Sequence, residues 1–383
     1  PLHQLVVGQA LQPLEHHRLP AARHQRFVQA ALGPLVGLRA SPGLQRVARR
    51  VLHYDVTSLY PSVMLAFGYF PRRDSLGVFP SLLRDLRTFR VQAKHLARTA
   101  ETDEARAHYD ALQSTFKILI NSFYGYLGFP LGHFNDYPAA NQVTAKGREL
   151  IQAIMAWLKD RGARLIEIDT DGLYVVAPPD VRTPEEEDRL LHDMSTILPE
   201  GISLELAGRY PAMFSYKMKN YVLLDEAGRL GITGSGLRSR GLELFQREWM
   251  EAMFLHLLRG ESEKIRELTQ RYAEAFEQHT FDIRKFMKTE TLQDSLETYR
   301  EKVRGGRRNP AATYELALRS ARPYQPGDQI SYYVAGTSKK VKVHEAAKLA
   351  SEWDPKNPDE NVEYYKAKLV ELAEKFRPFF ESR

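Results

Sequence analysis

Two aspartates stand one residue apart in IEIDTDGLYVV, residues 166–176, within a run that is otherwise mostly apolar. An ionised carboxylate is among the most costly groups to take out of water, so the segment predicts either a tight turn or a cation site. Aspartate and glycine are common turn residues, and Asp169, Asp171 and Gly172 taken alone fit a plain hairpin turn between two strands.

A third aspartate, Asp55, favours the cation site. It ends another strand-like run, in HYDVTSLYPS, so two strand ends could bring Asp55 and Asp171 together without any proximity in sequence. Carboxylates placed so close repel one another, and a divalent cation relieves that repulsion. The chain has no cysteine, and oxygen ligands favour Mg²⁺, or alternatively Mn²⁺, over zinc. We therefore expect a magnesium site.

Cationic and polar side chains lie on two other segments, residues 81–99 and 111–125. Both segments have helical periodicity, and a polar bend at 101–104 separates them. The spacings of three and four put these side chains on one face of each helix: Arg90 and Lys94 on the first, and Lys117, Asn121 and Tyr124 on the second. Any one of these cations, taken alone, is better explained as a solvated surface residue. Together with the carboxylates they suggest two-metal phosphoryl transfer.

Composition narrows the function classes. The 383 residues are enough for two or three domains, and a net charge of +6 favours a polyanionic partner. The absence of cysteine excludes disulfides, thiolate zinc sites, iron–sulfur clusters and a cysteine nucleophile. No apolar run is long enough for a membrane helix and the start has no signal-peptide pattern. We expect a cytoplasmic protein with no membrane partner, associated with the nucleoid in a bacterium or archaeon.

The elements that must position these residues follow a mixed α/β order. Residues 1–50 are rich in Pro, Gly, His and Arg and predict a partly irregular lead-in. A strand then leads to a helix start at Pro61 and to the helical hairpin. The pattern beyond it predicts, in order, a helix at 140–159, strand, turn and strand at 163–179, strands at 202–207 and 215–234 with a turn at 226–229, and helices beyond Gly241.

Three of these segments, in this order, resemble the family B DNA-dependent DNA polymerases. DVTSLYPS at 55–62 is similar to motif A, KILINSFYG at 117–125 to motif B and DTDG at 169–172 to motif C. Weaker similarity extends the resemblance to the C-terminus, in VTAKGREL (143–150), KMKNY (217–221), YQPGDQISYYV (324–334), Asn357-Pro358 and Tyr364-Tyr365.

The resemblance implies an α+β fold shaped as a right hand. Its palm would be an antiparallel sheet from residues 51–69 and 126–233, its fingers the helical hairpin at 70–125, and its thumb a mainly helical region at 234–383. Residues 1–50 would be a lead-in or a remnant. The implied activity is template-directed addition of deoxynucleotides to a primer 3′-hydroxyl with release of pyrophosphate, in replication or repair. The partners would be primer–template DNA and deoxynucleoside triphosphates, and accessory proteins are not predicted.

The resemblance also implies residue roles. Asp55 and Asp171 would ligate two Mg²⁺ ions, with the Val56 carbonyl as a further ligand and Asp169 as a neighbouring acid. The triphosphate would be held by the Ser58 and Leu59 amides and by Arg90, Lys94, Lys117 and Asn121. Tyr60 would exclude a 2′-hydroxyl and Tyr124 would stack near the nascent base pair. Without the motif, Tyr60 is better explained as a packed aromatic, and Tyr124 is an ordinary core tyrosine. DNA would be contacted by Lys219, Tyr221, Arg238, Arg240, Arg307 and Arg308.

The chain departs from the family pattern in two places. Motif C commonly reads Tyr-Gly-Asp-Thr-Asp-Ser in this family, whereas here Glu167-Ile168 precede it and Gly172 follows it. The residues ahead of Asp55 are too few for the usual 3′–5′ exonuclease domain, so we expect no proofreading by this chain, which would be either a naturally minimal polymerase or a fragment of a longer protein. Two alternatives remain: a two-metal nuclease, and a catalytically silent relative that binds DNA as a scaffold.

Overall fold

The computed structural model describes residues 47–238 and 241–381, which form two compact units. The first, here called the helical unit, comprises residues 56–157 and 193–203. The second, the sheet unit, comprises residues 47–55, 158–192 and the described part of 204–381. In the described part of the chain, no helix is both long and apolar enough to cross a membrane. Each unit is described by itself.

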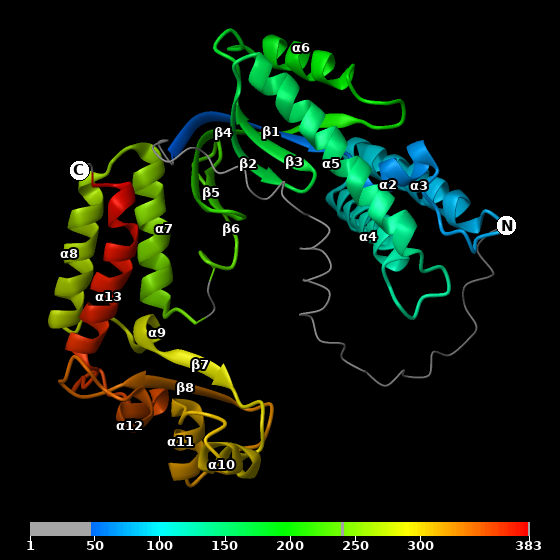
Figure 1. The fold of residues 1–383 in the computed structure, drawn as a ribbon. Coiled ribbons are helices and arrows are strands. Elements are labelled where there is room, and N and C mark those ends of the chain that lie inside the picture. The colour runs from blue at the N-terminus through cyan, green and yellow to red at the C-terminus, as the bar shows by residue number, and fades with distance from the viewer. Residues whose placement is uncertain (1–46, 239–240, 382–383) are drawn as a thin grey trace. The chain divides into compact units, whose positions relative to one another are not determined.

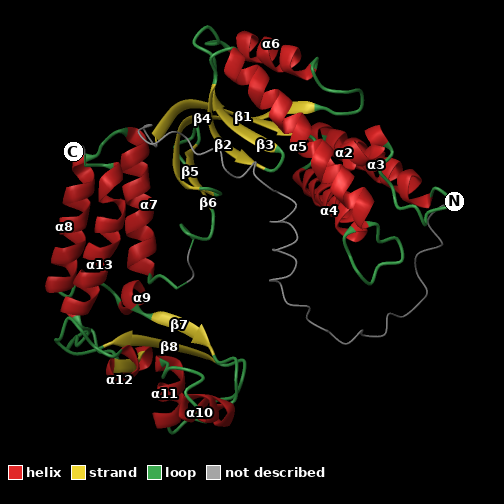
Figure 2. Cartoon of the chain, in the orientation of Figure 1, coloured by secondary structure: helices red, strands yellow, loops and turns green. Residues whose placement is uncertain are grey.

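The helical unit is built on a hairpin of two long helices, as predicted from the sequence (Figures 1 and 2). The Thr102 hydroxyl caps the second arm by accepting a hydrogen bond from the Ala105 amide, so the predicted polar bend contains the helix start. Phe89 and Phe116 lie 6.0 Å apart between ring centroids, which brings the two arms to the same level there. The helices of this unit are α2 (Leu59–Phe67), α3 (Val78–Thr99), α4 (Asp103–Leu127) and most of α5 (Tyr137–Asp160).

The buried face of α3 differs from the one that its apolar spacing suggests. Of the four residues whose spacing predicts the helix, Leu82, Phe89 and Leu96 are 42 to 49% exposed, and Leu86 is half-buried. The buried residues are Phe79, Leu83, Ala93 and Ala97. Phe79 and Leu83 fill the buried face in the first half of α3, and Ala93 and Ala97 lie on it in the second half, where small side chains let packed helices approach closely.

The sheet unit contains a six-stranded sheet in the order β2-β3-β1-β4-β5-β6. The pairs β1–β3, β2–β3, β4–β5 and β5–β6 are antiparallel. The strand, tight turn and strand predicted around Asp169 are confirmed as β2 and β3. The bounds are β1 (Val47–Val56), β2 (Arg164–Asp169), β3 (Gly172–Val176), β4 (Leu204–Lys217), β5 (Asn220–Leu224) and β6 (Leu230–Thr233), with α6 (Pro184–Ser195) between β3 and β4.

The strand β4 differs from the sequence prediction. It runs unbroken over 14 residues, whereas the pattern suggests a short strand at 202–207 and a separate one from Ser215. It ends in a second turn at Met218 and Lys219, within a run predicted to be continuous. Lys219 adopts a left-handed φ of 56°, which is uncommon for a lysine and belongs to this two-residue turn. The hairpin turn predicted at 226–229 is confirmed, since Asp225 and Arg229 close it.

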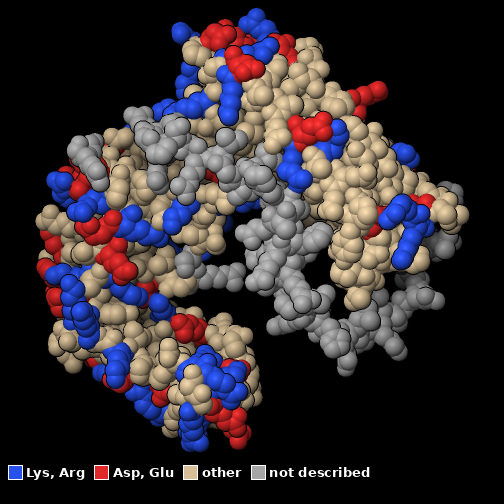
Figure 3. Space-filling model, in the orientation of Figure 1, with Lys and Arg blue, Asp and Glu red and all other residues tan. Residues whose placement is uncertain are grey.

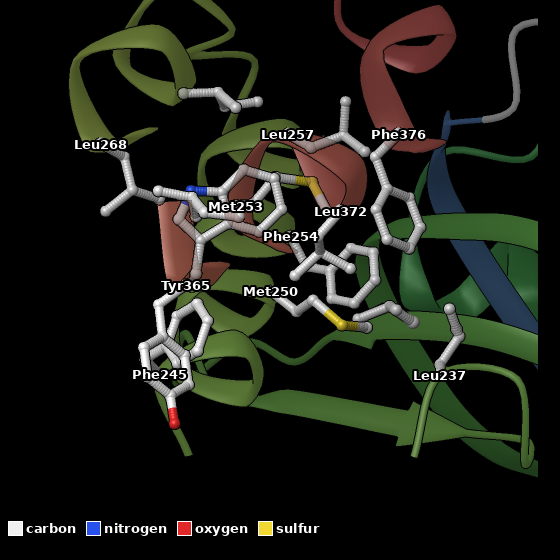
Figure 4. Close-up of a cluster of buried hydrophobic side chains, with 14 of the residues drawn as sticks. Leu237, Phe245, Met250, Met253, Phe254, Leu257, Leu268, Tyr365, Leu372 and Phe376 are labelled. Atoms are coloured by element: carbon white, nitrogen blue, oxygen red, sulfur yellow. The ribbon is translucent and has the colours of Figure 1, made fainter. Parts of the chain in front are cut away.

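The C-terminal part of the sheet unit packs three long helices around an aromatic core (Figures 1 and 4). Trp249 and Phe254 of α7, Leu268 of α8, and Leu372 and Phe376 of α13 are all buried in it. The same cluster includes residues of β4 and β5, so these helices continue the hydrophobic layer of the six-stranded sheet. Their bounds are α7 (Leu244–Arg259), α8 (Glu263–Glu277) and α13 (Val362–Phe376).

A three-stranded sheet in the same region was not predicted. Its order is β7-β8-β9, and both pairs are antiparallel. Its strands have only three to six residues, too few for alternation to stand out in a charged sequence. The remaining elements are α9 (Ile283–Phe286), β7 (Lys288–Thr291), α10 (Leu296–Arg304), α11 (Ala312–Arg319), β8 (Gln329–Val334), α12 (Val343–Ala346), β9 (Ala347–Leu349) and two 3₁₀ turns, Ala350–Glu352 and Arg377–Phe379.

Candidate active site

Two predicted acidic residues flank a glycine across three adjacent strands of the sheet unit. Asp55 on β1 pairs with Gly172 on β3, and Gly172 pairs in turn with Asp169 on β2. Residues directly opposite one another in an antiparallel pair share a face of the sheet. Asp55, Gly172 and Asp169 therefore form one row on one face, which we call the acidic row.

A second row lies beside the acidic row, two residues further along each strand. His53 pairs with Tyr174, and Tyr174 pairs with Glu167. Because successive side chains in a strand alternate between faces, this row shares the face of the acidic row. The His53 and Tyr174 rings stack at 4.2 Å with an angle of 8° between their planes. Burial lowers the pKa of His53, while the nearby Asp169 charge opposes that shift.

The turn between β2 and β3 holds the third predicted carboxylate, Asp171. Its amide donates a hydrogen bond to the Asp169 carbonyl over 2.7 Å. Thr170 has a φ of 60°, a strained conformation for a β-branched residue. Asp171 is half-buried. The turn predicted from the Asp-Thr-Asp-Gly segment is thus confirmed, and it carries backbone strain.

Lys219 lies against this turn. Its Nζ atom is 3.0 Å from Asp169 Oδ1 and 3.4 Å from Thr170 Oγ1. The Lys219 side chain is 44% exposed, and that of Asp169 is 36% exposed. The lysine proposed from sequence as a DNA contact therefore pairs with one of the three aspartates.

Glu167 is buried beneath this pair. Its carboxylate accepts a hydrogen bond from the Lys219 amide over 2.9 Å and another from the Ser215 hydroxyl over 3.1 Å. Burial raises the pKa of Glu167, and these two hydrogen bonds act in the opposite direction. A bulge at Ile166, where the β2–β3 register shifts, sets the face that Glu167 occupies.

Gly172 is required by close packing rather than by its backbone conformation. A Cβ atom at this position would lie 2.7 Å from His53 Nε2 and 3.6 Å from Asp55 Oδ1. The first distance is too short for a real contact, so any side chain at position 172 would displace the His53 ring. The absence of a side chain at position 172 therefore leaves the space that the His53 ring occupies.

The acidic residues suit a hard divalent cation in kind, because Asp55, Asp169 and Asp171 all offer carboxylate oxygens. Within residues 47–238 and 241–381, no three His, Asp or Glu side chains converge closely enough to form a metal site by themselves. Mg²⁺ is commonly bound by one or two carboxylates together with substrate phosphates. The donor set fits that pattern better than a preformed protein cage. Val56, the further predicted ligand, is the last residue of β1.

In the helical unit, the start of α2 is a site with unused hydrogen-bond donors. Ser58 precedes α2 with φ 49° and makes no side-chain cap. Arg90 Nη1 instead donates a hydrogen bond to Ser58 Oγ over 2.9 Å. Arg90 Nε is buried and has no hydrogen-bond partner within the described residues. The predicted residues Ser58, Leu59 and Arg90 are thus brought together at one helix N-terminus.

Tyr60 packs between two neighbouring helices of the same unit. Its ring centroid is 4.5 Å from that of Tyr124 on α4. A Cβ atom at Gly147 on α5 would lie 3.2 Å from the Tyr60 ring, so the glycine allows this close approach. Burial raises the pKa of Tyr124, which keeps its hydroxyl protonated. The predicted pair Tyr60 and Tyr124 is in direct contact.

The other predicted residues of the helical unit lie along the hairpin. Lys94 is half-buried on α3, one turn beyond Arg90. Lys117 and Asn121 are exposed on α4, one turn apart. They lie beside the level at which Phe89 and Phe116 bring the arms together. The predicted helix faces exist, and the triphosphate contact remains a prediction.

The predicted DNA-binding residues have varied surroundings. Tyr221 is 4% exposed and its hydroxyl lies 3.2 Å from that of Tyr174. Arg308 pairs with Asp294 over 2.9 Å and its guanidinium lies over the Tyr314 ring, while Arg307 and Arg238 are exposed. Arg240 lies outside the described residues. Figure 3 shows acidic and basic side chains interspersed over the helical part of the sheet unit, with no continuous basic surface on that face.

Sequence reasoning missed His53 and Glu167. Both stand two residues before an aspartate, in HYD and EID, on segments predicted to be strands. A period of two puts each on the face of the neighbouring aspartate. That spacing was the available signal, and Glu167 was noted only as a departure from motif C.

Comparisons with known proteins agree on one family. The sequence model for DNA polymerase family B matches residues 68–376. A DNA polymerase of Thermococcus sp. (strain 9oN-7) is 28% identical over 350 residues, which is 82% of this chain and 43% of that protein. A DNA polymerase of Pyrococcus glycovorans is 29% identical, over 81% of this chain and 42% of that protein. The chain thus spans less than half the length of these curated relatives.

The fold agrees as well. The structure of the family B DNA polymerase from the archaeon Pyrobaculum calidifontis superimposes with a TM-score of 0.68, covering 88% of this chain and 46% of that one. Its sequence identity is 22%, so this likeness concerns the fold. Because the family model covers most of residues 47–381, the chain belongs to DNA polymerase family B.

Proposed function

We propose that this chain carries out template-directed DNA synthesis, adding deoxynucleotides to a primer 3′-hydroxyl. The observation that carries the proposal is the acidic row, with Asp55 and Asp169 on either side of Gly172 and Asp171 in the adjoining turn, in a chain of DNA polymerase family B. In this proposal the six-stranded sheet is the palm, the α3–α4 hairpin the fingers and the C-terminal helices the thumb.

In this proposal the sheet unit holds the catalytic carboxylates. Asp55 and Asp171 bind two Mg²⁺ ions, with the Val56 carbonyl as a further ligand. When bound, the ions lower the pKa of the primer hydroxyl and neutralise charge on the departing pyrophosphate. In the chain without DNA, the Lys219 ammonium lies 3.0 Å from Asp169, which limits the repulsion among the three carboxylates.

The helical unit receives the triphosphate in this proposal. The N-terminus of α2 presents amide groups and the positive end of the helix dipole, which suits phosphate oxygens. Arg90 adds a fixed cation there, and its buried Nε atom is a donor that a phosphate oxygen can satisfy. Lys94, Lys117 and Asn121 add further contacts along the hairpin.

Sugar selection is assigned to Tyr60. Its ring is held by Tyr124 on one side and by the close approach of Gly147 on the other, so it has little freedom to move aside. A rigid ring beneath the incoming sugar leaves no space for a 2′-hydroxyl. Tyr124, whose ring lies against Tyr60, is assigned to the nascent base pair.

Primer extension on a recessed template in Mg²⁺ tests the proposal. The intact chain should extend the primer, and Asp55→Asn and Asp171→Asn should each lower the rate by about 100-fold or more, since metal stabilisation is worth several kcal/mol. Asp180→Asn, an exposed acid in the loop after β3, is the matched control and should keep wild-type activity.

The two alternatives give different results in the same assays. Tight binding of primer–template without extension by the intact chain would favour the scaffold. Mg²⁺-dependent cleavage without extension would favour the nuclease. Extension that survives in Asp171→Asn would refute the assignment of the carboxylates.

A further inference from the structure

Glu167 connects two parts of the sheet that are not neighbours. It lies on β2, and β3 and β1 separate that strand from β4 in the sheet order. Its Oε2 atom nevertheless accepts a hydrogen bond from Ser215 on β4, and its Oε1 atom accepts one from the amide of Lys219. The buried carboxylate therefore holds the β4–β5 turn against the strand that carries Asp169.

Lys219 depends on such a hold. Its left-handed backbone carries a conformational cost for a residue with a Cβ atom, and the hydrogen bond from its amide to Glu167 helps to offset that cost. Its side chain reaches Asp169 and Thr170, and it is 44% exposed, so its ammonium lies at the surface of the aspartate turn. Glu167 holds the backbone amide of Lys219, and this fixes the point from which the Lys219 side chain extends.

We propose that Glu167 is a positioning residue: it fixes the Lys219 turn so that the Lys219 ammonium is presented, beside the aspartate turn, to the end of a bound primer–template. The inference rests on the proposed function, because it takes DNA as the ligand of this face. It adds a role for a residue that departs from the family pattern.

The proposal predicts a change in DNA affinity opposite to the one that charge alone predicts. Removing a negative charge near a DNA-binding surface should strengthen binding if charge alone matters. A positioning role predicts weaker binding when the two hydrogen bonds are lost, despite the removed charge. Glu167→Leu loses the charge and both bonds, whereas Glu167→Gln loses the charge but keeps an acceptor for the Lys219 amide and a polar group for Ser215.

The experiment measures the dissociation constant of a labelled primer–template by fluorescence anisotropy, in EDTA and without nucleotides, over a series of salt concentrations. Each cation lost from the DNA interface reduces the slope of log K against log salt by about 0.9. A variant that binds as well as the wild type at 1 M salt therefore binds about eightfold more weakly than the wild type at 0.1 M salt. Lys219→Ala and Glu167→Leu should both show this loss, and Glu167→Gln should bind like the wild type.

Two further variants separate positioning from a general defect. Ser215→Ala removes one bond but leaves the bond to Lys219, so it should bind nearly as the wild type does. In the Lys219→Ala background, Glu167→Leu should cause no additional loss, because Glu167 acts through that lysine.

The outcomes are distinct. Wild-type or tighter binding by Glu167→Leu, or weaker binding by Glu167→Gln, would overturn the proposal. So would a loss that persists in the Lys219→Ala background. If Glu167→Leu fails to fold, Glu167→Ala, which also removes both hydrogen bonds, is measured in its place and must show the same loss. Failure of the wild type to bind or extend DNA would instead refute the proposed function.

Discussion

Adding one methyl group at Gly172 should destabilise the sheet unit, because the new Cβ atom would lie 2.7 Å from His53 Nε2. The His53 ring cannot yield freely, since it stacks on Tyr174, whose hydroxyl lies 3.2 Å from that of Tyr221. The serine that the resemblance puts at this position would meet the same nitrogen. Gly172→Ala is the smallest change that tests this contact.

Two opposing effects set the magnitude. Overpacking of this kind costs about 1 to 3 kcal/mol. Gly172 has no left-handed φ, so alanine fits its backbone and the loss of freedom in the unfolded chain returns about 0.4 to 1 kcal/mol. We expect Gly172→Ala to lower the free energy of unfolding by about 1 to 2 kcal/mol.

A double-mutant cycle measured by urea unfolding isolates the cause. In a His53→Ala background the added methyl group enters the space that the ring has left, so Gly172→Ala should cost little or become stabilising. The coupling between the two sites should be about 1 kcal/mol or more. Gly231→Ala on β6 is the matched control, because its Cβ atom would meet Leu223 Cβ at an ordinary 3.7 Å.

The reasoning about His53 is refuted if Gly172→Ala costs the same in both backgrounds, to within about 0.5 kcal/mol. It is also refuted if Gly231→Ala destabilises as much as Gly172→Ala. Either result would mean that the close contact does not determine the residue at position 172.

Two other predictions concern the proposed reaction. Tyr60→Ala should raise ribonucleotide incorporation relative to deoxynucleotide incorporation in a primer-extension assay. Tyr69→Ala is the control and should leave sugar discrimination unchanged, because the Tyr69 ring stacks on Phe67 instead. Equal discrimination by the wild type and Tyr60→Ala would contradict the role of Tyr60 in sugar selection. The purified chain should leave a labelled single strand of DNA intact in Mg²⁺, as expected from the sequence. The Asp171→Asn variant serves as the control. Mg²⁺-dependent trimming of the strand from its 3′ end would contradict that expectation.

Much of the candidate site could be predicted from sequence because its signals are local. The Asp-Thr-Asp-Gly segment predicts a turn from residue types alone, and the structure has that turn. The helical hairpin follows from periodicity and from a polar bend whose Thr102 caps α4. The motif order is also a property of the sequence, and it points to the family that the comparisons support.

The small C-terminal sheet and the outward face of α3 could not be predicted in the same way. Strands of three to six residues show too little alternation, and pairing partners are chosen by packing between distant segments. On α3, Phe79, Leu83, Ala93 and Ala97 face the core, whereas Leu82, Phe89 and Leu96 are exposed. The helical spacing of apolar residues predicts a helix, but it does not predict which apolar face of that helix is buried.

The sequence by itself determined that three carboxylates stand at or beside predicted strand ends, and that a glycine follows them at position 172. Only the tertiary structure decided what surrounds them: His53 Nε2 lies above Gly172, Lys219 lies against Asp169, and Glu167 holds the Lys219 turn across two intervening strands. The physical reason is register. A period of two specifies the face that each side chain occupies, but pairing and curvature of the sheet decide which faces meet.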